Sequence, residues 1–466
     1  MQNNNLPIAI IGGGPVGLAA AAHLTIKNIP FIVFEAGQSV GQNMLSWSHV
    51  RVFSPWKYNI DKAAKELLEQ TNWIAPDEEG LPTGKELVED YFRPLANLPQ
   101  IKPNIHLNAK VLSVGRKGLD KVKTWGREDK PFSIKVKENE VINYYEAKGV
   151  IDATGTWNQP NPIGSGGVYA EGEQELADHI FYGIPNVKED HLERYKNKNI
   201  AVVGGGHSAI NALLDLAEIQ KEYPETQLNW ILRKDSMDKV YGGKQDDALE
   251  ARGALGIRIE QLVNSGKLNV YTPFHILKLT KEERGIQVIG DLNGEMKAIK
   301  NVDEIISNTG SRPNLDMIRE VRIDLDSSLE SVFDLAELID PNIHSCGTVR
   351  PHGEKELRHP EKDFYIVGSK SYGRAPTFLM ATGYEQVRSI VAYLAGDIEA
   401  AERVELNLPE TGVCSSNLGI GGETAGGGCC GSEEETVNTE AACGIPEKES
   451  VVSGFETPQM GGGCCG

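Results

Sequence analysis

Cysteine is nearly absent from most of this 466-residue chain: of its 7 cysteines, only Cys346 precedes residue 414. The N-terminal residues MQNNNLP lead directly into an apolar run and lack the charged and apolar regions of a secretory signal peptide. A secreted scaffold held by disulfides is therefore disfavoured, because such scaffolds need many paired cysteines and an oxidising compartment. We expect a cytoplasmic protein.

Long apolar runs and excess positive charge are also missing. No uninterrupted apolar stretch approaches the roughly twenty residues that span a bilayer, so we expect no membrane-spanning helix. The formal net charge of −19 disfavours nucleic acid or an anionic membrane as the main partner. These bounds favour a globular enzyme of two or three domains that acts on a small molecule.

The most informative stretch that is present runs from Ile8 to Glu35. A short apolar strand leads into GxGxxG spacing at Gly12, Gly14 and Gly17, followed by an alanine-rich helix and a second strand that ends at the acid. These glycines permit a tight turn, close approach of a pyrophosphate and close packing of helix on strand, while the acid can accept hydrogen bonds from a ribose. The pattern predicts an adenine dinucleotide site; the alternative is a glycine-rich turn without a ligand.

Two later stretches are expected to face the same ligand. Residues 37–56 form a loop-like segment with Trp47, expected to cover the ligand; a surface loop anchored by tryptophan packing is the alternative. Residues 149–162, GVIDATGTWNQPNP, indicate a buried strand and a turn at Thr154 and Gly155. Small residues at a strand end let the backbone pass close to a bound nucleotide.

A second strand, turn and helix follow in NIAVVGGGHSAINALLDL. Gly204 and Gly206 repeat the turn spacing, and Ser208 and Ala209 stand where the third glycine is expected. The next strand delivers Arg233 where the first unit has its acid. Because a cation suits a 2′-phosphate, this unit favours NADPH over NADH; solvated surface charge is the alternative.

These motifs resemble the two-dinucleotide-binding-domain flavoproteins, which are FAD-dependent pyridine nucleotide oxidoreductases, and among them the flavin-containing monooxygenases. The resemblance covers residues 6–400 and implies an α/β fold with two Rossmann-like three-layer domains, the second inserted in the first. It implies FAD and NADPH as cofactors. The residues expected to bind FAD are Gly12, Gly14, Pro15, Gly17, Glu35, Trp47, Thr154, Gly155 and Gly368. Those expected to bind NADPH are Gly204, Gly206, Ser208 and Arg233.

The resemblance also suggests how the chain is divided. We expect an FAD-binding domain formed by residues 1–165 and 301–408, interrupted by an NAD(P)H-binding domain over residues 166–300. Residues 409–466 are expected to form a disordered tail. Within the first part, alternating runs over residues 132–151 predict an antiparallel layer.

The chain departs from several related patterns. It has no CxxC or CxxxxC pair after the first acid or in the second unit, so the thioredoxin reductase and glutathione reductase arrangements are absent. The Baeyer–Villiger fingerprint is not recognisable either, and Gly368 is followed by Ser369 where such flavoproteins often have aspartate. Monooxygenation of a soft nucleophile needs a dry pocket more than acids or bases, so no catalytic residue is named.

The tail has its own composition and an internal repeat. Residues 412–466 contain fourteen glycines, eight glutamates and one lysine, and GGGCCG occurs at 426–431 and again at 461–466. One further cysteine precedes each copy. The cysteines expected to bind a metal or metalloid are Cys414, Cys429, Cys430, Cys443, Cys464 and Cys465.

Three interpretations of the tail remain open. Two adjacent thiolates and a third from upstream suit a soft ion such as As(III), Cu(I) or Hg(II); thiol redox exchange and an incidental tail are the alternatives. A flexible chain of about 50 residues has an r.m.s. span of roughly 40 Å, so it could reach a flavin pocket of its own or, in a homodimer, of a neighbouring subunit. The preferred hypothesis is a monooxygenase-like enzyme whose tail captures a thiophilic substrate. The rivals are a disulfide or metal-ion reductase and a non-catalytic metal-binding flavoprotein sensor.

Overall fold

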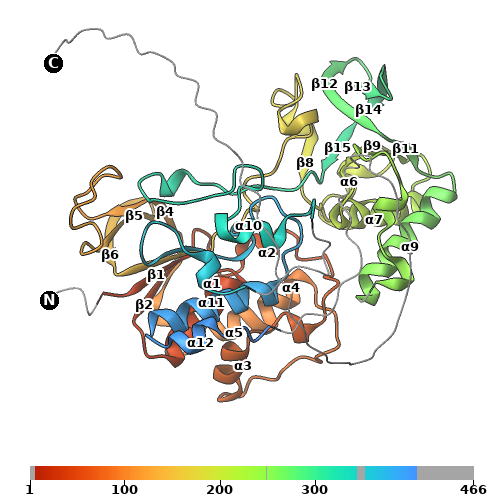
Figure 1. The fold of residues 1–466 in the computed structure, drawn as a ribbon. Helices are drawn as coiled ribbons and strands as arrows, with labels where there is room; N and C mark the ends of the chain where they lie inside the picture. The colour runs from red at the N-terminus through yellow and green to blue at the C-terminus, as the bar shows by residue number, and fades with distance from the viewer. Residues whose placement is uncertain (1–5, 248, 344–351, 407–466) are drawn as a thin grey trace, which may run out of the picture. The chain divides into compact units, whose positions relative to one another are not determined.

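A computed structural model of the chain describes residues 6–247, 249–343 and 352–406. Its framework is two five-stranded sheets in which every neighbouring pair of strands runs parallel. In each sheet the middle strand is one of the two strands that lead into a predicted dinucleotide turn (Figure 1). The predicted α/β fold with two Rossmann-like sheets is thus confirmed, whereas the predicted tail lies outside the described residues.

The first sheet has the strand order β16-β7-β1-β2-β3. Its strands are β1 (Ile8–Ile11), β2 (Phe31–Phe34), β3 (Ile105–His106), β7 (Gly149–Asp152) and β16 (Phe364–Ile366). The sheet therefore joins the beginning of the chain to a strand that follows the second sheet in sequence. The central strands are short, apolar and buried on both faces, as expected of a parallel sheet covered on each side.

Helices of the first domain cover this sheet, and α1 and α11 pack directly on each other. The helices are α1 (Pro15–Ile26), α2 (Gln42–Leu45), α3 (Lys62–Glu69), α4 (Gly84–Glu86), α5 (Arg93–Ala96), α10 (Phe333–Ile339), α11 (Met380–Leu394) and α12 (Ile398–Glu402). Gly383 on α11 makes the close contact possible, because a Cβ there would lie 2.5 Å from Val16 Cγ2. The contact ties the dinucleotide helix to the last long helix of the domain.

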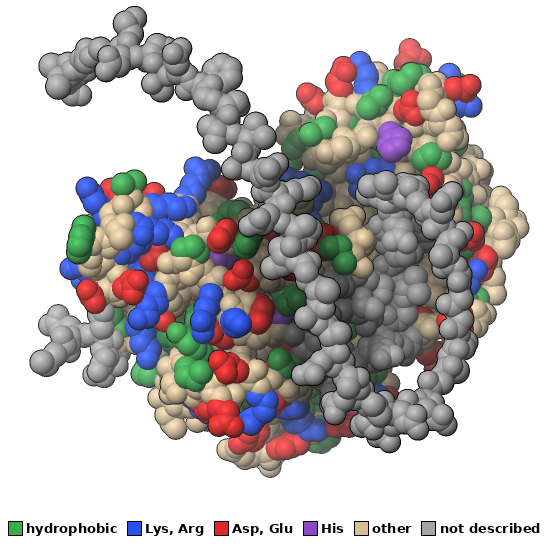
Figure 2. Space-filling view, in the orientation of Figure 1, with side chains coloured by type: hydrophobic (Ala, Val, Ile, Leu, Met, Phe, Trp, Pro, Cys, Tyr) green, Lys and Arg blue, Asp and Glu red, His purple; other side chains and the backbone are tan. Residues whose placement is uncertain are grey.

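The predicted antiparallel layer is present in the first domain. It consists of β4 (Ala109–Arg116), β5 (Phe132–Glu138) and β6 (Val141–Ala147), paired in that order. Side chains of β4 and β5 belong to the same hydrophobic core as the first sheet and its helices. Although the chain is acidic overall, many Lys and Arg side chains lie on the face that carries this layer (Figure 2).

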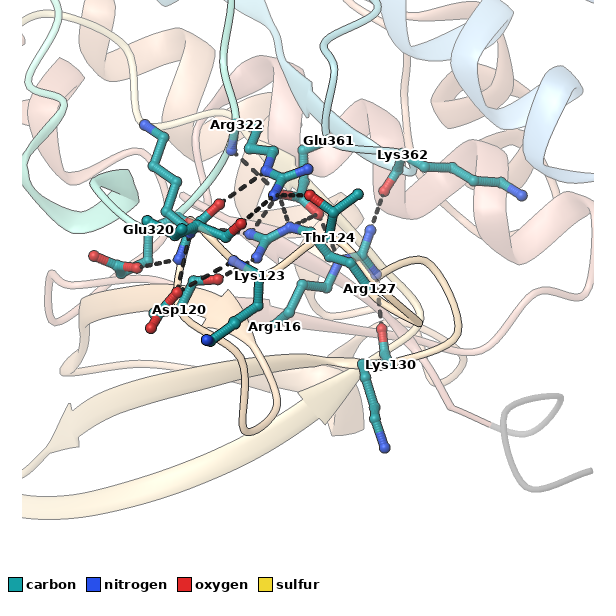
Figure 3. Close-up of polar contacts among 12 residues, drawn as sticks. Arg116, Asp120, Lys123, Thr124, Arg127, Lys130, Glu320, Arg322, Glu361 and Lys362 are labelled. Carbon is teal, nitrogen blue, oxygen red and sulfur yellow. Dashed lines mark hydrogen bonds and ion pairs between the residues drawn. The ribbon is translucent and has the colours of Figure 1, made fainter. Parts of the chain in front are cut away.

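A buried ion cluster fastens the antiparallel layer to the segment before β16 (Figure 3). Glu361 accepts from Arg116 Nε at 2.7 Å and from Arg127 Nη2 at 2.7 Å, and all three side chains are buried. Burial alone raises the pKa of Glu361, but the hydrogen bonds from both arginines outweigh that effect and leave the pKa below its ordinary value. The cluster is a structural clamp between segments far apart in the sequence.

The second sheet has the strand order β11-β10-β9-β15-β8. Its strands are β8 (Ile180–Tyr182), β9 (Asn199–Val203), β10 (Gln227–Ile231), β11 (Asn269–Tyr271) and β15 (Glu304–Ser307). Because β15 pairs with both β9 and β8, the second domain extends beyond residue 300, where the sequence placed its end. Alternate residues of β9 enter different cores: Ile200 and Val202 face one, Ala201 and Val203 the other.

Helices cover one face of the second sheet and an antiparallel meander covers the other. The helices are α6 (Leu192–Tyr195), α7 (His207–Glu222), α8 (Asp238–Tyr241) and α9 (Glu250–Asn264); the meander is β12 (Phe274–Glu282), β13 (Gly285–Leu292) and β14 (Glu295–Val302). This is a three-layer arrangement, as predicted. Within the described ranges, no helix combines the length and apolar character needed to cross a membrane.

Candidate cofactor sites

The first glycine turn follows β1 directly and leaves no room for larger residues at its two ends. Gly12 has φ of +104°, and a Cβ there would lie 2.7 Å from the carbonyl oxygen of Ala153. A Cβ at Gly17 would lie 1.9 Å from the carbonyl oxygen of Gly12. At Gly14, by contrast, an added Cβ would project into open space. The turn therefore has an uncovered middle, where a pyrophosphate can approach the N-terminus of α1.

Glu35 comes immediately after β2 and is held beside this turn. Its Oε2 accepts from the backbone N–H of Gly13 at 2.7 Å, and its Oε1 accepts from that of Gly37 at 2.7 Å. These bonds fix the carboxylate at the carboxyl end of the sheet. Such a carboxylate is placed to accept hydrogen bonds from ribose hydroxyls.

Two other predicted FAD segments converge on the same sheet edge. The Thr154–Gly155 turn follows β7, and its preceding carbonyl, that of Ala153, is the one that excludes a Cβ at Gly12. A Cβ at Gly155 would lie 3.4 Å from Ser369 Oγ, in the turn that follows β16. A Cβ at Gly368 would in turn lie 3.3 Å from a methyl group of Val16. The turns after β1, β7 and β16 thus form one contiguous cradle.

Trp47 packs against other residues of the chain. A Cβ at Gly84 would lie 2.8 Å from the Trp47 ring, and the Trp157 ring centroid is 6.3 Å away. Its contact with FAD remains a prediction, as does the direct binding role of each residue in the cradle.

An ion pair that the sequence analysis did not identify lies under the cradle. Lys370 Nζ donates to Asp152 Oδ2 at 2.7 Å and to Thr154 Oγ1 at 3.1 Å. The lysine is 2% exposed and the aspartate 0%. No motif marks this pair, since its members are 218 positions apart in the sequence.

The second glycine turn repeats the first with one difference. Gly204 has φ of +129°, and a Cβ there would lie 2.2 Å from the carbonyl oxygen of Asn308. A Cβ at Gly206 would meet open space, as at the middle of the first turn. At the third position, however, Ala209 is fully buried and its methyl group is accommodated. Ser208, next to it, is exposed at the start of α7.

A cavity of about 680 Å³ opens at this turn. Its lining includes residues 204–208, both cations that follow β10, and the segment after β15. Asn308 belongs to the lining, and its buried Nδ2 has no hydrogen-bond partner in the described part of the chain. The oxygens of a dinucleotide would supply the acceptor that this amide lacks, so the site fits a pyridine nucleotide.

The cavity is positively charged where a 2′-phosphate is expected. Arg233 is exposed and Lys234 is half-buried, and both line the cavity. Arg252 of α9 also lines it, with Nε and Nη2 donating to the two carboxylate oxygens of Asp247 at 2.7 and 2.8 Å. The sequence analysis identified Arg233 but not Arg252, because no motif distinguishes an arginine within an ordinary helical pattern.

His207, the first residue of α7, is a second lining residue that the sequence analysis did not assign. Burial, followed by repulsion from Arg252 and Lys234, lowers its pKa to about 4, although Asp247 acts in the opposite direction. The imidazole is therefore neutral at pH 7. The positive charge at this end of the cavity therefore comes from Arg233, Lys234 and Arg252, and His207 adds none.

The two connections between the sheets lie against each other. The turn after β7 and the turn after β15 pair through Asn161 N–H to the Gly310 carbonyl at 2.9 Å and Thr309 Oγ1 to the Asn161 carbonyl at 2.6 Å. Ser311 Oγ also donates to Thr156 Oγ1 at 2.8 Å. These bonds hold the two connections together.

The predicted metal-binding cysteines, Cys414, Cys429, Cys430, Cys443, Cys464 and Cys465, all lie outside the described residues. Cys346 does as well. Across the described ranges, no group of three or more His, Cys, Asp or Glu side chains could hold a metal ion. Metal binding by the six C-terminal cysteines therefore remains a prediction.

Comparison with known proteins decides the family. Residues 9–338 match the pyridine nucleotide-disulphide oxidoreductases. The chain belongs to this family. The predicted relationship to FAD-dependent pyridine nucleotide oxidoreductases is thereby confirmed, and the chain is an oxidoreductase that uses FAD and NADPH.

Two relatives of the chain are ferredoxin–NADP reductases. Ferredoxin–NADP reductase 2 of Bacillus licheniformis is 27% identical over 375 residues, covering 79% of this chain and 89% of the relative. Ferredoxin–NADP reductase of Lactobacillus johnsonii is 25% identical over 346 residues, covering 73% and 85%. The family is therefore clear. Ferredoxin, which these names give as the redox partner, is stated for those relatives and not for this chain.

Solved structures show the same fold. The bacillithiol disulfide reductase of Bacillus cereus has a TM-score of 0.62 at 19% identity, covering 84% of this chain and 99% of that one. The ornithine N-hydroxylase of Kutzneria sp. 744 has a TM-score of 0.55 at 15% identity, with coverage of 84% and 99%. Reductases and hydroxylases thus share this architecture, so the fold alone does not select the electron acceptor.

Proposed function

We propose that this oxidoreductase is monooxygenase-like and acts on a soft nucleophile, such as As(III), captured by the cysteines of its C-terminal segment. The observation that carries the proposal is the pairing of two complete nucleotide turns with a described part of the chain that contains no cysteine. No described residue can form a disulfide beside the flavin. Electrons are therefore expected to pass to oxygen or to a group that comes from elsewhere.

The residues of both sites have distinct roles in this proposal. The turn at Gly12–Gly17 and Glu35 hold FAD, and the turn at Gly204–Ser208 with Arg233 holds NADPH. Bound FAD would supply the chemistry, taking a hydride from NADPH and passing electrons onward. In an oxygenase reaction, NADPH, a proton, oxygen and the reduced substrate yield NADP⁺, water and the oxygenated substrate.

The repeated C-terminal cysteines give the protein a means of binding the substrate. Paired thiolates with a third from upstream match the preference of thiophilic ions for sulfur ligands.

A flavin-dependent reductase is the second candidate. It is favoured by the family, whose name refers to disulfides, and by the CC pairs at 429–430 and 464–465. Here NADPH and a proton convert one disulfide to two thiols and NADP⁺, with no oxygen consumed. Adjacent Cα atoms are about 3.8 Å apart, below the usual disulfide range of roughly 4.4 to 6.8 Å, so a disulfide between neighbours would be strained and easily reduced.

The deciding experiment follows NADPH oxidation by the FAD-loaded protein with simultaneous oxygen-electrode and free-thiol readings, with and without arsenite. The full-length chain is compared with a variant truncated at Gly412 and with one in which the six C-terminal cysteines are serine. The serine variant is the matched control, because it keeps the length and charge of the segment.

Oxygen uptake that arsenite stimulates only when the cysteines are present supports the proposal. Thiol formation that is stoichiometric with NADPH, without oxygen uptake, overturns it in favour of the reductase. Identical rates in all three proteins overturn any role for the cysteines in either reaction.

A further inference from the structure

The buried group formed by Lys370, Asp152 and Thr154 lies at the point where the FAD cradle is assembled. Asp152 ends β7 and is paired in register with Ile11 of β1 and Ile366 of β16. The lysine belongs to the turn after β16, and the threonine to the turn after β7. The three side chains therefore connect two of the turns that make up the cradle.

Their hydrogen bonds fix the threonine hydroxyl in one orientation. Thr154 Oγ1 donates to Asp152 Oδ1 at 2.7 Å and accepts from Lys370 Nζ at 3.1 Å. The backbone N–H of Thr154 also donates to Asp152 Oδ1, at 3.2 Å. Both the side chain and the backbone of the turn are therefore held by the same buried carboxylate.

Stability alone is a weak reason for such an arrangement. Burying an ammonium group and a carboxylate costs several kcal/mol per ion, and well-packed apolar residues of similar size often serve as well or better. Lys370 and Asp152 lie at the carboxyl end of a parallel sheet, where ligands bind, rather than deep between layers. The directional bonds of the pair suit a task of positioning.

We propose that Lys370 is a positioning residue for FAD, which keeps the Thr154–Gly155 turn at the spacing from Gly12 that the cofactor requires. The spacing is tight, because the carbonyl of Ala153 would lie 2.7 Å from a Cβ at Gly12. A small displacement of the turn would therefore close or open the approach to the first glycine. The inference rests on the predicted FAD-binding role of the cradle and not on the identity of the substrate.

The opposite end of β16 supplies a matched control. Glu361 precedes that strand and is paired with Arg127 and Arg116, with burial like that of Lys370 and Asp152. This clamp lies away from the three turns of the cradle, at the end where β16 begins. Removing Arg127 should disturb a buried ion pair of the same domain without moving the cradle.

The test measures release of FAD from full-length holoenzyme, followed as the rise of flavin fluorescence after dilution, well below each variant's melting temperature. Lys370→Met should accelerate release about tenfold or more. Thr154→Val should accelerate it in the same direction, whereas Thr154→Ser keeps the hydroxyl and should restore slow release. Arg127→Met should lower the melting temperature while leaving the release rate unchanged.

A double-mutant cycle then tests whether the lysine acts through the threonine. If it does, Lys370→Met combined with Thr154→Val should release FAD no faster than the faster-releasing single variant, since both remove one shared interaction. Additive effects, or unchanged release in Thr154→Val, would overturn the proposal. Thr154→Val removes no charge, so this arm remains informative even if Lys370→Met fails to fold.

Discussion

The two dinucleotide turns have the same backbone and opposite chemistry. Each begins with a glycine of positive φ, at +104° for Gly12 and +129° for Gly204, and each has an uncovered glycine in the middle. After the next strand, however, one unit delivers Glu35 and the other Arg233. We therefore expect the backbone of each turn to bind a pyrophosphate, and the residue after the second strand to select the rest of the nucleotide.

The third position shows that the spacing of the motif does not by itself require glycine. At Gly17 a Cβ would overlap the carbonyl oxygen of Gly12, at 1.9 Å, whereas the second turn accommodates Ala209 in a fully buried position. The requirement depends on how closely each helix approaches its own turn. Identical motifs therefore tolerate different substitutions.

The largest loss of stability is expected when the residues at the third position of the two turns are exchanged in type, alanine for glycine and glycine for alanine. Gly17→Ala should destabilise the first domain by more than about 4 kcal/mol and yield protein without flavin, because a backbone atom blocks the new methyl group. The reciprocal change, Ala209→Gly, should cost only about 1 kcal/mol through helix propensity. Flavin absorbance per protein and thermal unfolding measure both. Normal flavin content in Gly17→Ala would contradict the close approach.

At the second turn, two substitutions distinguish backbone strain from steric blocking of the nucleotide. Gly204→Ala should both lower the melting temperature and raise the KM for NADPH, since its φ is positive and the Asn308 carbonyl lies 2.2 Å from the new Cβ. Gly206→Ala should raise the KM roughly tenfold without loss of stability, because its methyl group enters open space intended for the ligand. Flavin content should be unchanged in both. Equal melting temperatures for the two variants would contradict this account.

Arg233→Gln should weaken the preference for NADPH. A charge-assisted hydrogen bond is worth about 1.5–3 kcal/mol, so kcat/KM for NADPH should fall roughly ten- to hundredfold while that for NADH changes little. Steady-state kinetics with both nucleotides measure the ratio. The matched variant in the first unit, Glu35→Gln, should instead weaken FAD binding and leave the preference for NADPH over NADH intact.

The sequence was sufficient to predict what depends on local order. The strands, glycine turns and terminal acid or cation of each unit lie within a few tens of residues, so the two sheets and the turns at Gly12 and Gly204 were correctly expected. The boundary near residue 300 was misplaced because β15 resembles other buried strands, and only its pairing with β9 shows where it belongs.

Long-range pairs were beyond the reach of the sequence. Lys370 looks like an ordinary surface residue, and its burial follows from Asp152, 218 positions away. Arg252 is similarly hidden in a helical pattern, although its partner Asp247 is near in sequence. Charged residues at such places are recognised only when the fold shows that solvent is excluded from them.

The smallest expected effect is on the pH dependence of stability, and it concerns two histidines, of which one lines the pyridine nucleotide cavity. Burial is the main cause that holds the pKa of both His207 and His359 at about 4, below the ordinary value of 6.5. The unfolded chain therefore binds more protons between these pH values, and each histidine should reduce stability as the pH falls from 6.5 towards 4. Replacing either by asparagine should reduce the pH slope of the unfolding free energy by up to about 1.4 kcal/mol per pH unit.

Ligand binding separates the two histidines, because only His207 lines the pyridine nucleotide cavity. The charges facing it are those of Arg252, Lys234 and Asp247, and a pyrophosphate would add negative charge that raises its pKa. Saturating ADP-ribose, which has no 2′-phosphate to titrate, should therefore flatten the pH slope in the wild type and in His359→Asn but not in His207→Asn. Denaturant unfolding at several pH values measures the slopes. An equal response in both variants would show that the nucleotide does not interact with His207, and would leave the cations alone responsible for the electrostatics of the second turn.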